Sequence, residues 1–110
     1  MKILNTETND EDLCLHAFID LYNVDDPEVG LNVVDLGLIY RLIFDKEEKT
    51  LDAEFTLTTE FCPMGESITS NITNSLKDSF PDWEINVNLI FNPPWAASMI
   101  SMEGQEFLGW

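Results

Sequence analysis

Apolar positions recur along the chain with two different periods. In the N-terminal part they follow three- and four-residue steps, which predicts an amphipathic helix. A capping residue and carboxylates at 9–12 begin this helix, and Pro27 ends it near 24–28, because a residue before proline avoids the helical conformation. Its apolar stripe consists of Leu13, Cys14, Ala17, Phe18, Leu21 and Tyr22.

Three later segments are typical of strands. Residues 40–44 form the first, the charged segment 45–50 is a turn, and 51–59 return with clean alternation of apolar and polar side chains. The third strand spans 84–91 and stops at the stiff segment 92–95, which contains two prolines.

A second and a third helix are predicted between and after these strands. Residues 63–80 carry apolar side chains every four positions, and a short helix from about 97 to 108 ends before Gly109. Residues 1–9 are polar, and we expect them to be frayed.

The predicted order is therefore α-β-β-α-β-α. Strands with one apolar face and helices gathered on that face make an α/β (α+β) two-layer sandwich with a small three-stranded mixed sheet. The helical connection between the second and third strands is long enough for a right-handed crossover, which allows these strands to be parallel. We expect one domain over residues 1–110.

The composition narrows the choice of partners. Twenty-one acidic residues against five basic ones give a formal charge of −16. Such a chain is repelled by nucleic acid and by anionic lipid, so its surface either provides solubility or meets a basic partner. No apolar run approaches the roughly 18 residues of a membrane span, and the N-terminus lacks a signal-peptide pattern, so we expect a cytoplasmic protein.

Candidate chemistry centres on Cys62, at the joint between a strand and a helix. Pro63 suits the first turn of that helix, whose positive end favours a thiolate, whereas Glu60 and Glu66 favour the thiol. From the residues alone, a structural and a functional role for Cys62 both stay open. Cys14 lies on the apolar stripe of the first helix, and we expect it to be buried and inert.

Several kinds of site are missing from the sequence. There is no Cys-x-x-Cys, calcium loop or phosphate-binding glycine loop, and we expect the only histidine, His16, on the surface. Nucleophilic catalysis is therefore disfavoured, and we do not expect an enzyme. Asp35, which stands among apolar residues, is expected to cap backbone N–H groups or to face a site.

Three segments together resemble one family. Residues 26–40, 58–64 and 91–95 are similar to the SufT/PaaD-type iron–sulfur assembly proteins, bacterial relatives of the eukaryotic cytosolic iron–sulfur targeting protein. The resemblance covers roughly residues 10–110 and implies the small α/β domain of that family. It also implies an accessory, non-enzymatic role in delivering iron–sulfur clusters to apo-proteins.

The resemblance also implies a site. Its motif positions are Asp26, Glu28, Asp35, Thr58, Thr59 and Cys62. Cys62 would be the thiolate that contacts iron or a cluster, with Asp35, Thr58 and Thr59 around the same small pocket. Because a cluster usually takes four thiolates, one cysteine implies transient ligation shared with a homodimer partner, an apo-protein or an assembly scaffold.

Other interpretations stay open. The PaaD branch suggests a non-catalytic accessory subunit of a phenylacetate-type multicomponent oxygenase, although the extra C-terminal cysteines of that branch are missing here. A thiol redox protein centred on Cys62 is the other alternative. Trp95 either packs over the core or binds a partner, and residues 108–110 either cap the last helix or resemble a targeting tail.

Overall fold

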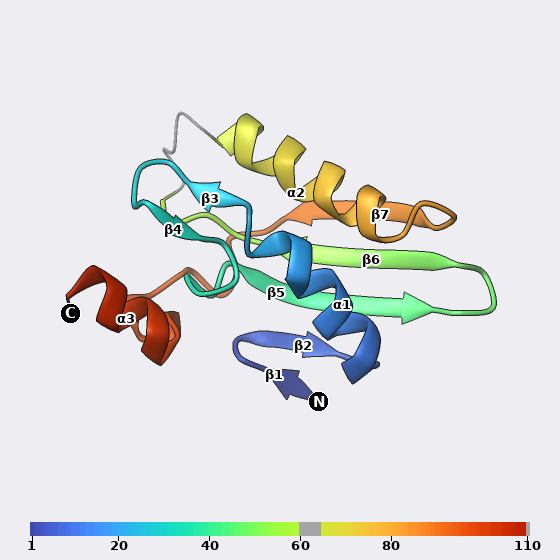
Figure 1. The fold of residues 1–110 in the computed structure, drawn as a ribbon, viewed down its shortest axis with the longest axis horizontal. Helices are drawn as coiled ribbons and strands as arrows, with labels where there is room; N and C mark the ends of the chain where they lie inside the picture. Colours follow the sequence, from blue (N-terminus) through green and yellow to red (C-terminus); the bar gives the residue numbers. More distant parts are fainter. Residues whose placement is uncertain (60–64, 110) are drawn as a thin grey trace.

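The structure, a computed structural model, describes residues 1–59 and 65–109 (Figure 1). The N-terminal elements are β1 (Lys2–Ile3), β2 (Thr6–Thr8), α1 (Glu11–Leu21), β3 (Asp25–Asp26) and β4 (Leu31–Asn32). The later elements are β5 (Ile39–Asp45), β6 (Thr50–Phe55), α2 (Gly65–Ser79), β7 (Glu84–Leu89), the 3₁₀ turn η1 (Ala97–Met99) and α3 (Met102–Leu108).

The main sheet has five strands in the order β1-β2-β5-β6-β7. The pairs β1/β2 and β5/β6 are antiparallel, whereas β2/β5 and β6/β7 are parallel. The mixed sheet and the parallel arrangement of β6 and β7 are as predicted. Strands β3 and β4 form a separate antiparallel hairpin.

The prediction of three strands was wrong, because residues 1–9 are ordered as β1 and β2. β2 joins β5 by parallel backbone pairing and by two side chains: the Thr6 hydroxyl donates to the Ile39 carbonyl and the Thr8 hydroxyl to the Leu42 carbonyl, both at 2.7 Å. Hydrophobic periodicity does not reveal a strand that is attached through side-chain hydroxyls. This segment therefore looked like a frayed terminus in the sequence.

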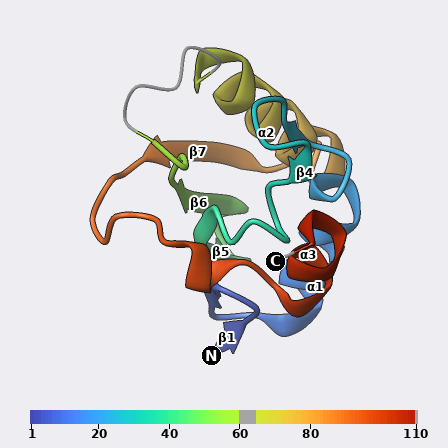
Figure 2. The same ribbon diagram turned by 90° about the vertical axis from the view of Figure 1, so that its left-hand side faces the viewer.

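Helices α1 and α2 lie side by side on one face of the sheet, as predicted, but α3 lies at one end of it (Figures 1 and 2). The predicted helix over 97–108 is also broken, because Ile100 and Ser101 have extended backbones between η1 and α3. Ser101 caps α3, and Gly109 ends it in the left-handed conformation, as the sequence predicts.

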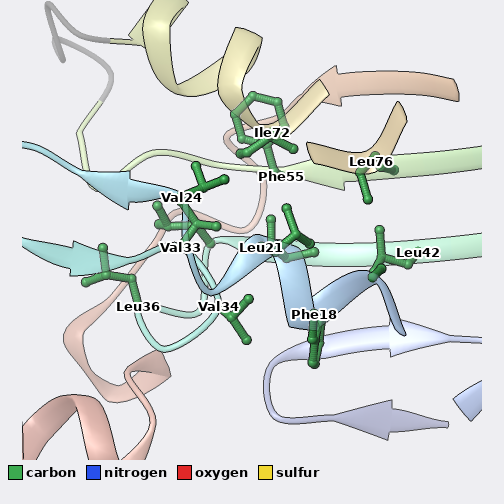
Figure 3. Close-up of a cluster of buried hydrophobic side chains, with 14 of the residues drawn as sticks. Phe18, Leu21, Val24, Val33, Val34, Leu36, Leu42, Phe55, Ile72 and Leu76 are labelled. Atoms are coloured by element: carbon green, nitrogen blue, oxygen red, sulfur yellow. The ribbon is translucent and has the colours of Figure 1, made fainter. Parts of the chain in front are cut away.

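The core lies between the two helices and the sheet (Figure 3). Phe18 and Leu21 from α1 meet Leu42 and Phe55 from the sheet and Ile72 and Leu76 from α2; all are almost completely buried. The apolar stripes read from the sequence are thus the faces that pack. In the part of the chain that the structure describes, no helix is long and apolar enough to cross a membrane.

The loop between β4 and β5 makes a close approach to the C-terminal segment at Gly37. Its φ of +76° is in the left-handed region, and a Cβ there would overlap the carbonyl oxygen of Met99 and lie 3.0 Å from its carbonyl carbon. Only glycine satisfies both conditions. Gly30 has a similar φ of +82°, but open space surrounds the position of its missing Cβ.

These two glycines predict different effects of the same substitution. We expect Gly30→Ala to cost about 1 kcal/mol of unfolding free energy, for backbone strain alone. Gly37→Ala should cost roughly 2–4 kcal/mol, because overlap with Met99 adds to that strain. Urea denaturation of both variants measures the difference, and equal losses would show that the approach of Met99 imposes no constraint.

Candidate functional site

Asp26 and Glu28 lie on the β3–β4 hairpin. Asp26 is completely buried, and one carboxylate oxygen, Oδ1, accepts a hydrogen bond from the Glu28 backbone N–H at 2.9 Å. The Asp26 carbonyl accepts from the N–H groups of Val29 and Gly30 at 3.2 and 2.7 Å. Asp26 therefore builds the turn that presents the exposed Glu28 side chain.

The second carboxylate oxygen of Asp26, Oδ2, is buried and has no hydrogen-bond partner among the described residues. A buried acceptor left unpaired costs about 1–3 kcal/mol, and native structures contain few of them. No described residue pairs with this oxygen. It is available to a bound group that reaches it.

Thr58 and Thr59 follow β6, with Thr58 half-buried and Thr59 exposed. The hairpin with Asp26 and the chain after β6 lie at the same end of the sheet, the end that faces the viewer in Figure 2. Cys62 lies outside the described residues. Across residues 1–59 and 65–109, no group of three His, Cys, Asp or Glu side chains could hold a metal ion.

Asp35 occupies a different network. Its Oδ2 accepts from the Asn32 amide at 2.7 Å and its Oδ1 from the Ser101 hydroxyl at 2.8 Å, while its backbone carbonyl accepts from Ser101 N–H at 2.7 Å. The expectation that its carboxylate caps backbone N–H groups was wrong, because both of its oxygens bind side chains. Asp35 fastens the start of α3 to the loop before β5.

Ser101 is a residue that the sequence analysis missed. Its hydroxyl donates to Asp35 and accepts from the Gly104 N–H at 3.0 Å, so one oxygen caps α3 and joins it to the rest of the molecule. A serine before Met102, with Glu103 in the first turn, is an N-cap signal that could have revealed the helix boundary. Nothing local could have revealed its partner, Asp35.

Trp95 packs against the core, which is the first of the two roles that its position suggested. Its indole N–H donates to the Leu36 carbonyl at 2.7 Å, and its ring is partly buried against the hydrophobic cluster. The nearby Tyr40 hydroxyl donates to the Pro93 carbonyl at 2.9 Å. These contacts hold the segment after β7 across the end of the sheet.

Cys14 and His16 are placed as the sequence predicts. Cys14 has no exposed surface, and burial is the main reason that the pKa of its thiol rises to about 11. His16 lies on the surface of α1, with its ring 5.3 Å from that of Phe80. Cys14 is not available as a metal ligand at neutral pH, because ligation by cysteine requires a thiolate.

Comparison with known proteins resolves the family. The family described as iron-sulfur cluster assembly protein matches residues 20–89, which include α1 in part and every element from β3 to β7. The chain belongs to this family. The membership confirms the resemblance inferred from residues 26–40, 58–64 and 91–95.

Relatives with assigned roles cover most of the chain. The Fe–S protein maturation auxiliary factor SufT of Staphylococcus aureus (strain USA300) is 35% identical over 84 residues, 76% of this chain and 94% of that protein. The Fe–S protein maturation auxiliary factor YitW of Bacillus subtilis (strain 168) is 33% identical over 89 residues, 81% of this chain and 86% of that protein.

Solved structures of family members share the fold. A domain of unknown function from Bacillus anthracis superposes with a TM-score of 0.82 at 33% identity, covering 90% of this chain and 93% of that one. A Mycobacterium tuberculosis protein described as associated with Fe–S complex assembly and repair gives a TM-score of 0.50 at 34% identity, covering 91% and 88%. The fold described here is therefore also found in proteins of other organisms.

The Asp35–Ser101 contact predicts the effect of removing the hydroxyl. Ser101→Ala should lower the unfolding free energy by about 1–3 kcal/mol, because it removes a helix cap and leaves a buried carboxylate oxygen unpaired. Ser98→Ala, an exposed position in η1, is the matched control and should change stability little. If the double variant with Asp35→Ala loses the sum of the two single losses, the contact is not a coupled one.

The burial of Cys14 predicts that its thiol resists modification. In a Cys62→Ser variant, iodoacetamide at pH 8 should label no cysteine in the folded protein and one in urea, as counted by mass spectrometry. The unfolded thiol ionises near its ordinary pKa of 9.0, below the folded value of about 11, so Cys14 should also make stability fall as the pH rises between them. Rapid labelling of the folded variant would contradict the burial.

Proposed function

We propose that this protein is an accessory factor that delivers or inserts iron–sulfur clusters into apo-proteins, and that Cys62 contacts the cluster transiently. The observation that carries the proposal is the similarity to maturation auxiliary factors over about four-fifths of the chain. The auxiliary role named for those relatives supports a non-catalytic one here. The cluster is cargo in this proposal, and its proposed location is the cytoplasm.

The two cysteines of the chain support the choice of Cys62. Cys14 is buried in the core with a raised thiol pKa, so it cannot serve as a ligand without unfolding of α1. Any thiolate that this chain offers to iron must therefore come from Cys62. Asp26, Glu28, Thr58 and Thr59 are the residues that we propose to surround it.

The donor set supports transient binding in preference to permanent storage. A cluster usually takes four thiolates, and once Cys14 is excluded the chain provides one, that of Cys62. Three buried side-chain oxygens have no partner among the described residues, and Oδ2 of Asp26 is the one that belongs to a carboxylate. The remaining ligands would come from an assembly scaffold, an apo-protein or a second copy of this chain, each of which can leave with the cluster.

Anaerobic reconstitution with iron and sulfide tests the role of Cys62. The wild type should bind iron and develop visible absorption, Cys62→Ser should lose both, and Cys14→Ala should retain both as the matched control. Molecular mass, measured in parallel, shows whether a second copy supplies ligands. Equal iron content in the wild type and Cys62→Ser would contradict the proposal that Cys62 binds the cluster.

Asp26 provides a second test. Asp26→Asn keeps the oxygen that accepts from the Glu28 N–H, so the variant should fold, but it removes the negative charge at the unpaired position. We expect its iron affinity to fall by about tenfold, the effect typical of a lost supporting group at a metal site. Asp25→Asn, an exposed neighbour on β3, is the control and should bind iron as the wild type does. Iron titration of both variants measures the difference.

A further inference from the structure

The free edge of β7 has the geometry of a docking site for an extended peptide. β7 is the last strand of the sheet, and among the described residues it pairs with β6 alone (Figure 1). The N–H of Glu84 donates to Lys49 and that of Ile90 to Phe55, both at 2.8 Å. In a parallel pair, alternate residues direct their backbone groups to the neighbouring strand and away from it.

This alternation leaves the odd-numbered residues of β7 unpaired. The N–H and carbonyl groups of Ile85, Val87 and Leu89 point away from β6, and no described residue forms a backbone or side-chain hydrogen bond with them. Three donors and three acceptors thus stand in a row along the edge. They match the backbone of another extended chain.

The two edges of the sheet differ in how they are protected. β1, at the other edge, has two residues and begins with Lys2, features that discourage pairing with a further strand. β7 has six residues, Glu84–Leu89, and contains neither lysine nor proline. Apart from Glu84 at its start, the β7 edge carries none of the features that usually prevent pairing, as expected of an edge that a partner covers.

A cavity of about 500 Å³ lies at the end of this edge. Its apolar lining comes from Leu57, Leu89 and Phe91, and its polar lining includes Glu66, Thr69 and Ser70. The side chain of Leu89 is 40% exposed, which is high for a leucine on the helix side of the sheet. A strand added to β7 would place an apolar side chain in this cavity.

The negative charge of the protein indicates which kind of strand can pair with β7. The chain carries a net charge of −16, and Glu84 and Glu66 mark the two ends of the docking surface formed by β7 and the cavity. A second copy brings the same charge and the same carboxylates, whereas a basic segment is attracted to them. The expected binding partner is therefore an extended segment that pairs through its backbone, places an apolar side chain in the cavity and carries basic residues on both sides of it.

We propose that the β7 edge binds an extended, basic segment of a client protein by strand addition. This inference rests on the proposed function and specifies how the client is held. The cavity is lined by Leu57 and Gly65, which stand in the sequence on either side of residues 58–64, the segment with the proposed ligand. A client docked there would be held beside Thr58 and Thr59 when a cluster is transferred.

A synthetic peptide tests the docking surface without iron. The probe is a fluorescent seven-residue peptide in which valine alternates with lysine or arginine, and fluorescence anisotropy measures its affinity for the apo-protein. We expect Val87→Pro to weaken binding about tenfold, because it removes one outward N–H and hinders pairing on either side. Val87→Ala keeps that N–H and should bind as the wild type does.

Two further probes cover the case in which Val87→Pro does not fold. Leu89→Asn, at an exposed position, should also weaken binding about tenfold, since it replaces the apolar side chain at the cavity by a polar one without adding charge. The same peptide with alternate backbone nitrogens methylated keeps its charge but cannot pair, and it should lose binding to the wild type. Equal affinity of the methylated and unmethylated peptides would show attraction by charge alone and overturn the proposal.

The remaining outcomes are equally decisive. If the apo-protein dimerises and Val87→Pro abolishes the dimer, the β7 edge binds a second copy of the chain. That result would overturn the proposal that it binds a client protein. Absence of peptide binding overturns the docking surface even if iron uptake still depends on Cys62, in which case the proposed function stands. If the peptide binds but iron uptake does not depend on Cys62, the docking surface is supported and Cys62 is not the ligand. The failure of the docking surface and the failure of the proposed function are thus distinguishable.

Discussion

The contact between the loop before β5 and the segment after β7 is the constraint on which the ends of this molecule depend. Asp35 binds the Ser101 hydroxyl and backbone, Leu36 accepts from the Trp95 indole, and Gly37 admits the Met99 backbone where any side chain would collide. Three consecutive residues thus fix one segment. They place α3 at the end of the sheet and direct the chain that leaves β7 along a single path.

Several features of the molecule have no partner among the described residues. One carboxylate oxygen of Asp26 accepts a hydrogen bond within the hairpin turn, and the other is buried without a partner among the described residues. β7 has a row of backbone groups that no described residue pairs, and a cavity with apolar and polar lining lies where that strand ends. A rigid sheet packed against α1 and α2 supports these features, so they stay in place without contributing to stability. This arrangement is consistent with a protein that receives cargo and clients for a short time.

The two cysteines show how environment separates residues of the same type. Cys14 belongs to the apolar stripe of α1, and its burial raises the thiol pKa to about 11. Cys62 follows Thr58 and Thr59 in the motif by which the chain resembles its family. The exclusion of Cys14 supports the proposal for Cys62, because Cys62 is then the only cysteine of the sequence that can bind iron.

The amino-acid sequence by itself determined the helices α1 and α2, the strands β5, β6 and β7, the burial of Cys14 and the family, since these depend on local periodicity and on contiguous motifs. Only the tertiary structure decided the attachment of β1 and β2, the break between η1 and α3, and the partners of Asp35. Threonine hydroxyls that bind a distant strand and a serine that joins an aspartate 66 positions away leave no periodic signal. The Asp26 oxygen and the β7 edge, which no described residue pairs, are likewise properties of arrangement, because the lack of a partner depends on where distant residues lie.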